Sequence, residues 1–138
     1  MAVYDETKGG TIGFPSNRMG HVFVMRTVLD CAEANAGSGL ASGDSAQVLN
    51  LPANHHVMSV RAQVLEAEGA TMTFDVGDSG SNTRWHNGLD GNATSTEAID
   101  TTVTSGTAAD DIRVHVNNAA SKARIEVAAL VADLNPDG

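Results

Sequence analysis

The sequence contains a single cysteine, and its other scarcities are equally informative. Cys31 cannot form a disulfide within the chain, so the fold has to be held by its core alone. Aromatic residues make up only 4 % of the chain, and no run approaches the roughly 20 apolar residues of a membrane-spanning helix. The first twenty residues lack a basic end followed by an apolar run, so we expect no secretory signal.

Basic residues are also scarce. Eight Lys and Arg face 17 Asp and Glu, for a formal net charge of −9. Binding to nucleic-acid phosphates or to an anionic membrane surface needs clustered positive charge, so we expect neither partner. The 138 residues fit one domain, and a chain of this length can bury about two thirds of its unfolded surface.

Residues 1–20 are predicted to form an extended amino-terminal arm. They carry four glycines and one proline, and no helical or strand period persists among them. Tyr4, Ile12 and Phe14 give the arm apolar side chains that a partner surface would cover. Residues 21–138 are then expected to form a β-sandwich domain.

Alternation of apolar and polar residues with a period of two dominates the rest of the chain. It predicts strands rich in β-branched residues, separated by turn signals every 8–12 residues. The expected strands cover residues 21–31, 46–51, 56–68, 71–76, 98–104, 111–117 and 123–131. This pattern, without a convincing helix, predicts an all-β fold, an antiparallel β-sandwich of seven or eight strands.

The long strand 56–68 carries several specific expectations. Its apolar face is read as Met58, Val60, Ala62 and Val64, and its acidic residues Glu66 and Glu68 as pointing to solvent. The short connection after Glu68 predicts a hairpin with the strand 71–76. Residues 77–95 are expected to be a long loop without strand structure.

Two strands have more apolar faces than a free sandwich needs. One stripe is Val22, Val24 and Val28 in the first long strand. The other belongs to the last strand and reads Ala128, Leu130, Ala132, Leu134. Exposed apolar stripes of this kind mark subunit contacts, so we expect a homodimer or homotrimer. The candidate interface residues are Tyr4, Ile12, Phe14, Val22, Val24, Val28, Leu130 and Leu134.

The long loop holds a candidate ligand site made of Asp78, Asn82, Trp85 and Asp90. Its oxygen-rich composition resembles a calcium loop, but the ligand order of an EF-hand is missing, and turns favour the same residues. Trp85 in turn offers either a platform for stacking on a sugar or a plug for the end of the sandwich.

The sequence shows no residue pattern typical of a catalytic or metal-binding site. No Gly-x-Ser-x-Gly motif is present, and Cys31 falls in the apolar phase of its strand, which indicates a buried, unreactive thiol. The adjacent His55 and His56 point to opposite faces of a strand, so one metal ion cannot readily bind both. We therefore expect no enzyme activity, no metal and no cofactor.

The sequence resembles the small jelly-roll decoration (cement) proteins of tailed bacteriophage capsids. The residues that carry this resemblance are the segment Met72 to Asp78 (MTFDVGD), the following NTRW at 82–85 and NGLD at 87–90, and the closing apolar strand 123–134. Together with the Gly-rich arm and the acidic balance, the resemblance extends over most of residues 20–134.

This resemblance implies a virion structural protein with no catalytic residues. It would be made in the host cytoplasm, bind the major capsid protein on the capsid exterior, and stabilise the phage head. The negative charge fits a position outside the shell, away from the packaged DNA. A phage tail or fibre component and a small carbohydrate-binding β-sandwich module remain the alternatives.

Overall fold

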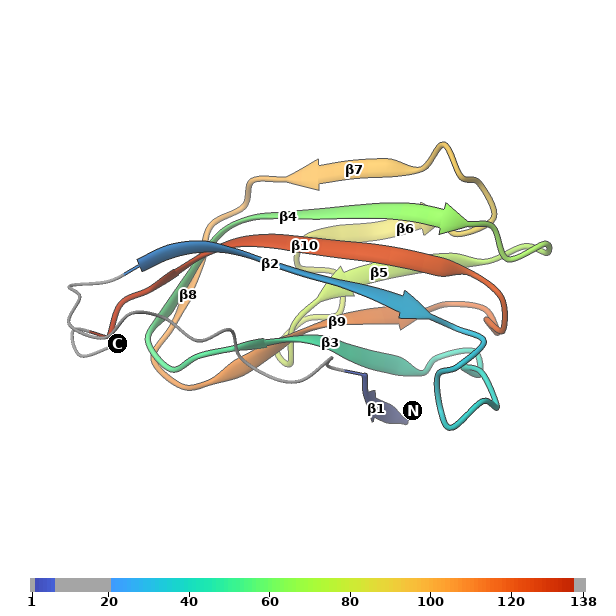
Figure 1. Cartoon of the computed structure of the whole chain (residues 1–138), viewed down its shortest axis with the longest axis horizontal. Coiled ribbons are helices and arrows are strands. Elements are labelled where there is room, and N and C mark those ends of the chain that lie inside the picture. The colour runs from blue at the N-terminus through green and yellow to red at the C-terminus, as the bar shows by residue number, and fades with distance from the viewer. Residues whose placement is uncertain (1, 7–20, 136–138) are drawn as a thin grey trace.

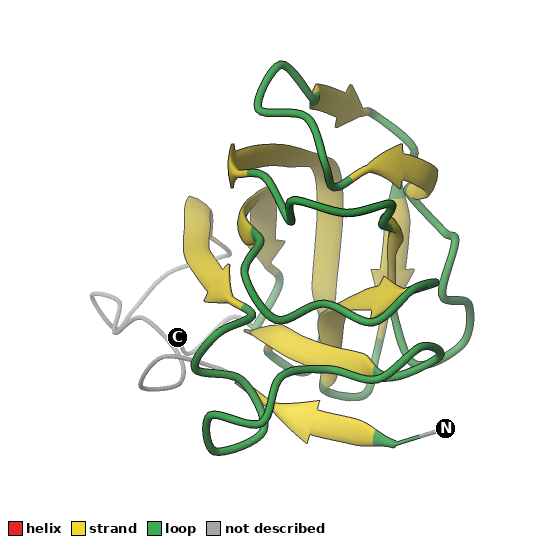
Figure 2. Cartoon of the chain, turned by 90° about the vertical axis from the view of Figure 1, so that its right-hand side faces the viewer, coloured by secondary structure: helices red, strands yellow, loops and turns green. Residues whose placement is uncertain are grey.

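The computed structural model describes residues 2–6 and 21–135. These residues form strands and loops without a helix (Figure 2), and hence no helix that could cross a membrane. The ten strands are β1 (Val3–Asp5), β2 (His21–Asp30), β3 (Ser45–Leu51), β4 (His55–Glu66), β5 (Thr73–Gly77), β6 (His86–Asp90), β7 (Glu97–Asp100), β8 (Thr104–Gly106), β9 (Asp110–Val116) and β10 (Arg124–Asp133).

The strands build two facing sheets with jelly-roll connections (Figure 1). One sheet has the order β1-β3-β9-β5-β6, and the other has the order β2-β10-β4-β7, with β8 paired to β4. All pairings are antiparallel except that of β1 with β3. The chain passes from one sheet to the other between most consecutive strands, as in a jelly roll. The expected antiparallel jelly-roll sandwich is confirmed.

The strand list differs from the sequence prediction in the short elements. β6 lies inside residues 77–95, which were predicted to be a loop, and β1 lies inside the arm, where no strand was expected. The residues His-Asn-Gly-Leu-Asp of β6 have few β-branched or apolar side chains, so only their pairing with β5 makes them a strand.

The predicted hairpin of strands 56–68 and 71–76 is wrong. β4 belongs to the sheet β2-β10-β4-β7, whereas β5 pairs with β6 and β9 in the opposite sheet. The connection between β4 and β5 therefore passes from one sheet to the other. A short, turn-like connection and alternating flanks do not distinguish this crossing from a hairpin.

Glu68, predicted to be exposed, is buried in that crossing. β4 ends at Glu66, so the alternation of the strand no longer sets the direction of the Glu68 side chain. Its carboxylate accepts hydrogen bonds from the backbone N–H groups of Ser121, Lys122 and Ala123 at 2.9–3.1 Å. Glu68 thereby fixes the β9–β10 connection against the β4–β5 connection.

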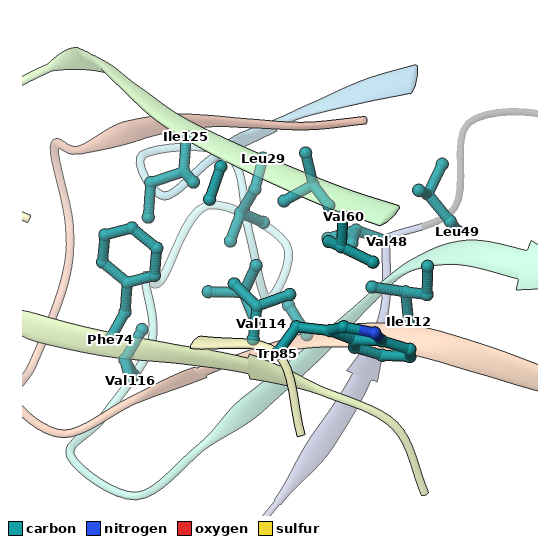
Figure 3. Packing of buried hydrophobic residues seen from close by; sticks show 14 of the residues in the cluster. Leu29, Val48, Leu49, Val60, Phe74, Trp85, Ile112, Val114, Val116 and Ile125 are labelled. Atoms are coloured by element: carbon teal, nitrogen blue, oxygen red, sulfur yellow. The ribbon is translucent and has the colours of Figure 1, made fainter. Parts of the chain in front are cut away.

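The core fills the space between the sheets (Figure 3). Leu29, Val60 and Ile125 face it from one sheet, and Phe74 and Val114 face it from the other. On β4 the inward face differs from the prediction at one residue. The register with β10 slips between Leu130 and Val131, so Val57 is buried in place of Met58, which is half-buried.

Candidate interaction surface

The two predicted apolar stripes meet on one surface. β2 and β10 are neighbours, and their register places Val24 opposite Leu130 and Val22 opposite Ala132. Met25 and Leu29 of β2 point into the core, so the alternation of the strand directs Val22 and Val24 outward. Val22 is 64 % exposed and Val24 is 59 % exposed. We call this outward side of β2-β10-β4-β7 the outer face.

The outer face continues across β4 to the short strand β7. Arg61 of β4 pairs with Ala128 of β10 on one side and with Ile99 of β7 on the other. Ile99 is 63 % exposed. A shallow hollow of about 230 Å³ lies in this face, and it is lined by Val24, Ser59, Arg61, Ile99, Ala128, Ala129 and Leu130. The outer face therefore combines protruding apolar side chains with a depression between them.

An ion-pair network borders the hollow. The carboxylate of Glu126 accepts hydrogen bonds from Arg26 Nε at 2.8 Å and from Arg61 at 2.6 Å. Arg61 also lies 3.3 Å from Glu97 on β7. Burial would raise the pKa of Glu126, but the hydrogen bonds and charges of Arg26 and Arg61 outweigh it and lower that pKa. The network thus keeps the charges of the outer face largely paired.

The other predicted interface residues are spread over the molecule. Val28 lies farther along the outer face of β2 and is half-buried. Tyr4 lies on β1 and packs against the core from the edge of the opposite sheet. Leu134 follows β10, is exposed, and lines a separate depression with Asn54 and His55. Ile12 and Phe14 are outside the described residues.

The structure does not bring the candidate ligand-loop residues together. Asp78 follows the end of β5, whereas Asp90 pairs with Thr73 at the start of β5, so the length of the strand separates them. The buried carboxylate of Asp78 accepts hydrogen bonds from the backbone N–H groups of Gly80 and Ser81 and from Arg84. Asn82, which lies between Asp78 and Asp90 in the sequence, is half-buried. This is the bonding of a turn, which accounts for Asp78 without a ligand.

Trp85 lies in the core and is 3 % exposed. Its ring N–H donates a hydrogen bond to the backbone carbonyl of Thr102 at 3.2 Å. The indole packs within the core cluster (Figure 3). At 3 % exposure it has no open face on which a sugar ring can stack, so it resembles a plug.

Histidine and cysteine side chains give no sign of reactive chemistry in the described part of the chain. His55, His56, His86 and His115 each have a hydrogen-bond partner of their own, and no three metal-binding side chains are gathered there. The Cys31 thiol is buried, and burial, followed by the nearby carboxylates of Glu68 and Asp30, raises its pKa to about 12.

Three solved structures with a similar fold are of bacteriophage capsids. A chain from an acid-stable capsid structure of Helicobacter pylori bacteriophage KHP30 has a TM-score of 0.63 and 14 % identity, with 85 % of this chain and 95 % of that chain covered. A chain of the cyanophage Pam1 capsid asymmetric unit has a TM-score of 0.61 and 24 % identity, with 93 % and 92 % covered. A chain of the Ralstonia phage GP4 capsid has a TM-score of 0.61 and 16 % identity, with 92 % and 96 % covered.

The chain shares its fold with these capsid chains. Because nearly the whole of each neighbour is covered, the neighbours are proteins of similar size and not domains of much larger chains. No family model and no curated protein matches the sequence.

Sequence reasoning missed two residues that complete the outer face, Ile99 and Arg61. Ile99 lies in a short stretch of polar residues, and a single apolar side chain there does not form the alternation that indicates an apolar strand face. Arg61 alternates with the buried Val60 and Ala62 of β4, but only the strand order places it beside Ala128 and Ile99.

Proposed function

We propose that this chain is a virion structural protein of a bacteriophage, a decoration (cement) protein that binds the outside of the head. Its contact with the shell is the outer face, and its occupant is an apolar surface of the major capsid protein. The observation that carries this proposal is the open patch formed by Val22, Val24 and Ile99 around the hollow beside Leu130.

The patch has the composition of a protein interface. Apolar side chains that are about 60 % exposed in the isolated chain lose that exposure when a partner covers them, and each fully covered Val or Ile contributes about 1.5–3 kcal/mol. Arginine is enriched in protein interfaces relative to the rest of the surface. Arg61 lines the hollow, and Arg26 lies on β2 opposite Ala128, another residue of its lining.

The charge distribution supports the proposed orientation. On the outer face, Arg26, Arg61 and Arg124 offset the carboxylates of Glu126 and Glu97, so most of the net charge of −9 lies on the rest of the chain. The less acidic face can approach a shell surface, while the acidic remainder faces solvent. An acidic protein on the inside would instead meet the packaged DNA, which repels it.

The three capsid neighbours support a role in a virion and not in catalysis. They are chains of capsid structures with a similar length and a similar fold. In the described residues, the histidines and the buried thiol provide no nucleophile or metal site that argues for an enzyme. The proposed role is therefore mechanical, the bridging of shell subunits from outside.

A binding experiment with phage heads tests this proposal. Heads of the same phage assembled without this protein are mixed with the purified chain at micromolar concentration and sedimented. We expect saturable co-sedimentation and a higher disruption temperature for the decorated heads. If the chain stays in the supernatant, the proposal fails; if it binds without raising that temperature, it is a decoration but not a cement.

A further inference from the structure

β2 forms one edge of the sheet β2-β10-β4-β7, and its outer edge is open as far as residues 2–6 and 21–135 show. The strand has ten residues and pairs with β10 in an unbroken register from His21 to Asp30. No other described strand pairs with β2. A long open edge is a template for adding a further strand.

The direction of each backbone group in β2 follows from one hydrogen bond. The N–H of Cys31 donates to the carbonyl of Ala123 at 2.9 Å, on the β10 side. In an antiparallel pair, residues bonded to the neighbour alternate with residues that face away. Every second residue counted back from Cys31 therefore bonds to β10, namely Leu29, Thr27, Met25 and Phe23. The residues between them direct their backbone N–H and C=O groups to the open edge. These are Val22, Val24, Arg26 and Val28.

The features by which proteins protect an open edge are missing from β2. The strand contains no proline and no lysine, and its register with β10 has no bulge. Arg26 is its only charged side chain before Asp30, and the carboxylate of Glu126 balances that charge. The same residues that have free backbone groups also include the exposed Val22 and Val24.

We infer that β2 pairs antiparallel with β2 of a second copy of this chain, about a two-fold axis, and joins the two sheets edge to edge. A second copy suits this edge because the four open residues are self-complementary. When Val24 faces Arg26 of the second copy, Val22 faces Val28, and all four open residues of each copy find a partner. These four pairs make about eight backbone hydrogen bonds, two for each pair.

Neighbouring registers are less favourable. A shift that centres the pairing on Arg26 places two arginines directly opposite each other, which destabilises a strand pair. A shift that centres it on Val24 leaves Val28 of each copy unpaired with the other open residues. The charge and the number of pairs therefore select one register. This dimer would also unite the patches around Val24 and Leu130 of both copies into one surface.

The inference goes beyond the proposed function and is tested on the isolated protein, without phage heads. Light scattering and native mass spectrometry of the wild type should give twice the mass of the chain at micromolar concentration. Val24→Pro removes the N–H that faces the open edge but none that bonds to β10, so a monomer with an unchanged circular dichroism spectrum is expected. Val24→Thr keeps this N–H, and this control should remain dimeric.

Cross-linking tests the register and does not depend on proline being tolerated. In the inferred register, the Cα atoms of Val24 and Arg26 of the second copy lie about 5.5 Å apart, within the range of a disulfide. A mixture of the Val24→Cys and Arg26→Cys chains should therefore form an oxidised dimer that neither variant forms efficiently alone.

Three results would overturn the inference. The first is a wild type that remains a monomer at micromolar concentration. The second is an oligomer that Val24→Pro leaves intact. The third is a cross-link that forms with Val24→Cys alone as readily as with the mixture.

Discussion

Arg26 and Glu126, one hundred residues apart in sequence, are joined on the outer face by a hydrogen bond of 2.8 Å between Arg26 Nε and Glu126 Oε2. The bond connects the edge strand β2 to its neighbour β10. Arg61 extends the connection to β4, and Glu97 extends it to β7. One carboxylate therefore links side chains across the sheet that carries the candidate interaction surface.

Glu126→Gln should destabilise the fold at neutral pH. The amide presents an N–H group to one of two arginines that need an acceptor, and a hydrogen bond to a charged group contributes about 1.5–3 kcal/mol. Because folding lowers the pKa of Glu126, its contribution is present above the pKa of the unfolded chain and is lost as pH falls through the folded pKa.

Urea unfolding of this variant and of the wild type at pH 7 and pH 3 measures the effect. We expect a difference of about 1.5–3 kcal/mol at pH 7 that shrinks at pH 3. Glu97→Gln, at the half-exposed end of the network, is the matched control, with a loss of about 0.5 kcal/mol or less. Equal losses for the two variants would contradict a central role for Glu126.

Glu68→Gln should loosen the β9–β10 connection. Burial would raise the pKa of Glu68, but the backbone N–H groups of Ala123, Lys122 and Ser121 outweigh it and lower that pKa. A Gln side chain has one acceptor oxygen in place of two, so we expect a loss of about 1–3 kcal/mol at pH 7 that diminishes in acid.

Hydrogen exchange gives this prediction a local readout. The amides of residues 121–123 should exchange faster in Glu68→Gln than in the wild type. Glu66→Gln, at the exposed end of β4, should leave both stability and exchange unchanged. Unchanged exchange in Glu68→Gln would show that other contacts hold this connection.

The Cys31 thiol should be unreactive in the folded protein. A pKa raised to about 12 leaves almost no thiolate at pH 8, and the buried sulfur is closed to a reagent. Ellman's reagent should therefore detect one thiol in denaturant and none within minutes in native buffer. Fast labelling of the native protein would contradict the packing of the core around Cys31.

Tyr4→Ala should destabilise the sandwich although Tyr4 lies in the predicted arm. Tyr4 packs against the core, and β1 is joined to β3 through Ser45 N–H to the Ala2 carbonyl and Glu6 N–H to the Gln47 carbonyl. We expect a loss of about 1–2 kcal/mol on thermal unfolding, because the ring is half-buried. Val3→Ala, on the exposed side of the same strand, should cost about 0.5 kcal/mol or less.

Long strands were predictable because the period of two is sustained over many residues. Met25 and Leu29 are buried and Val22 and Val24 are exposed, as their alternation in β2 predicts. The short strand β6 was not predictable, because five residues without a hydrophobic alternation become a strand only by pairing with β5.

The candidate surface was predictable in its parts but not as a whole. The stripes of β2 and β10 were recognised separately, while the pairing that unites them joins residues about a hundred positions apart. The slip in register beside Met58 and the burial of Glu68 depend on contacts with distant segments, so the local sequence does not predict them. Trp85 left two interpretations open, and only its position between the sheets decides between them.

Binding of Val24→Asp to phage heads tests the central claim most directly. Val24 is exposed and lines the hollow of the outer face, and a carboxylate there has to be desolvated when an apolar shell surface covers it. Val103→Asp, at an equally exposed valine that does not line the hollow, is the matched control. Both proteins should fold as the wild type does. We predict that Val24→Asp binds undecorated heads at least tenfold more weakly than the wild type while Val103→Asp binds normally; equal binding by the two variants would contradict the assignment of the outer face as the shell contact.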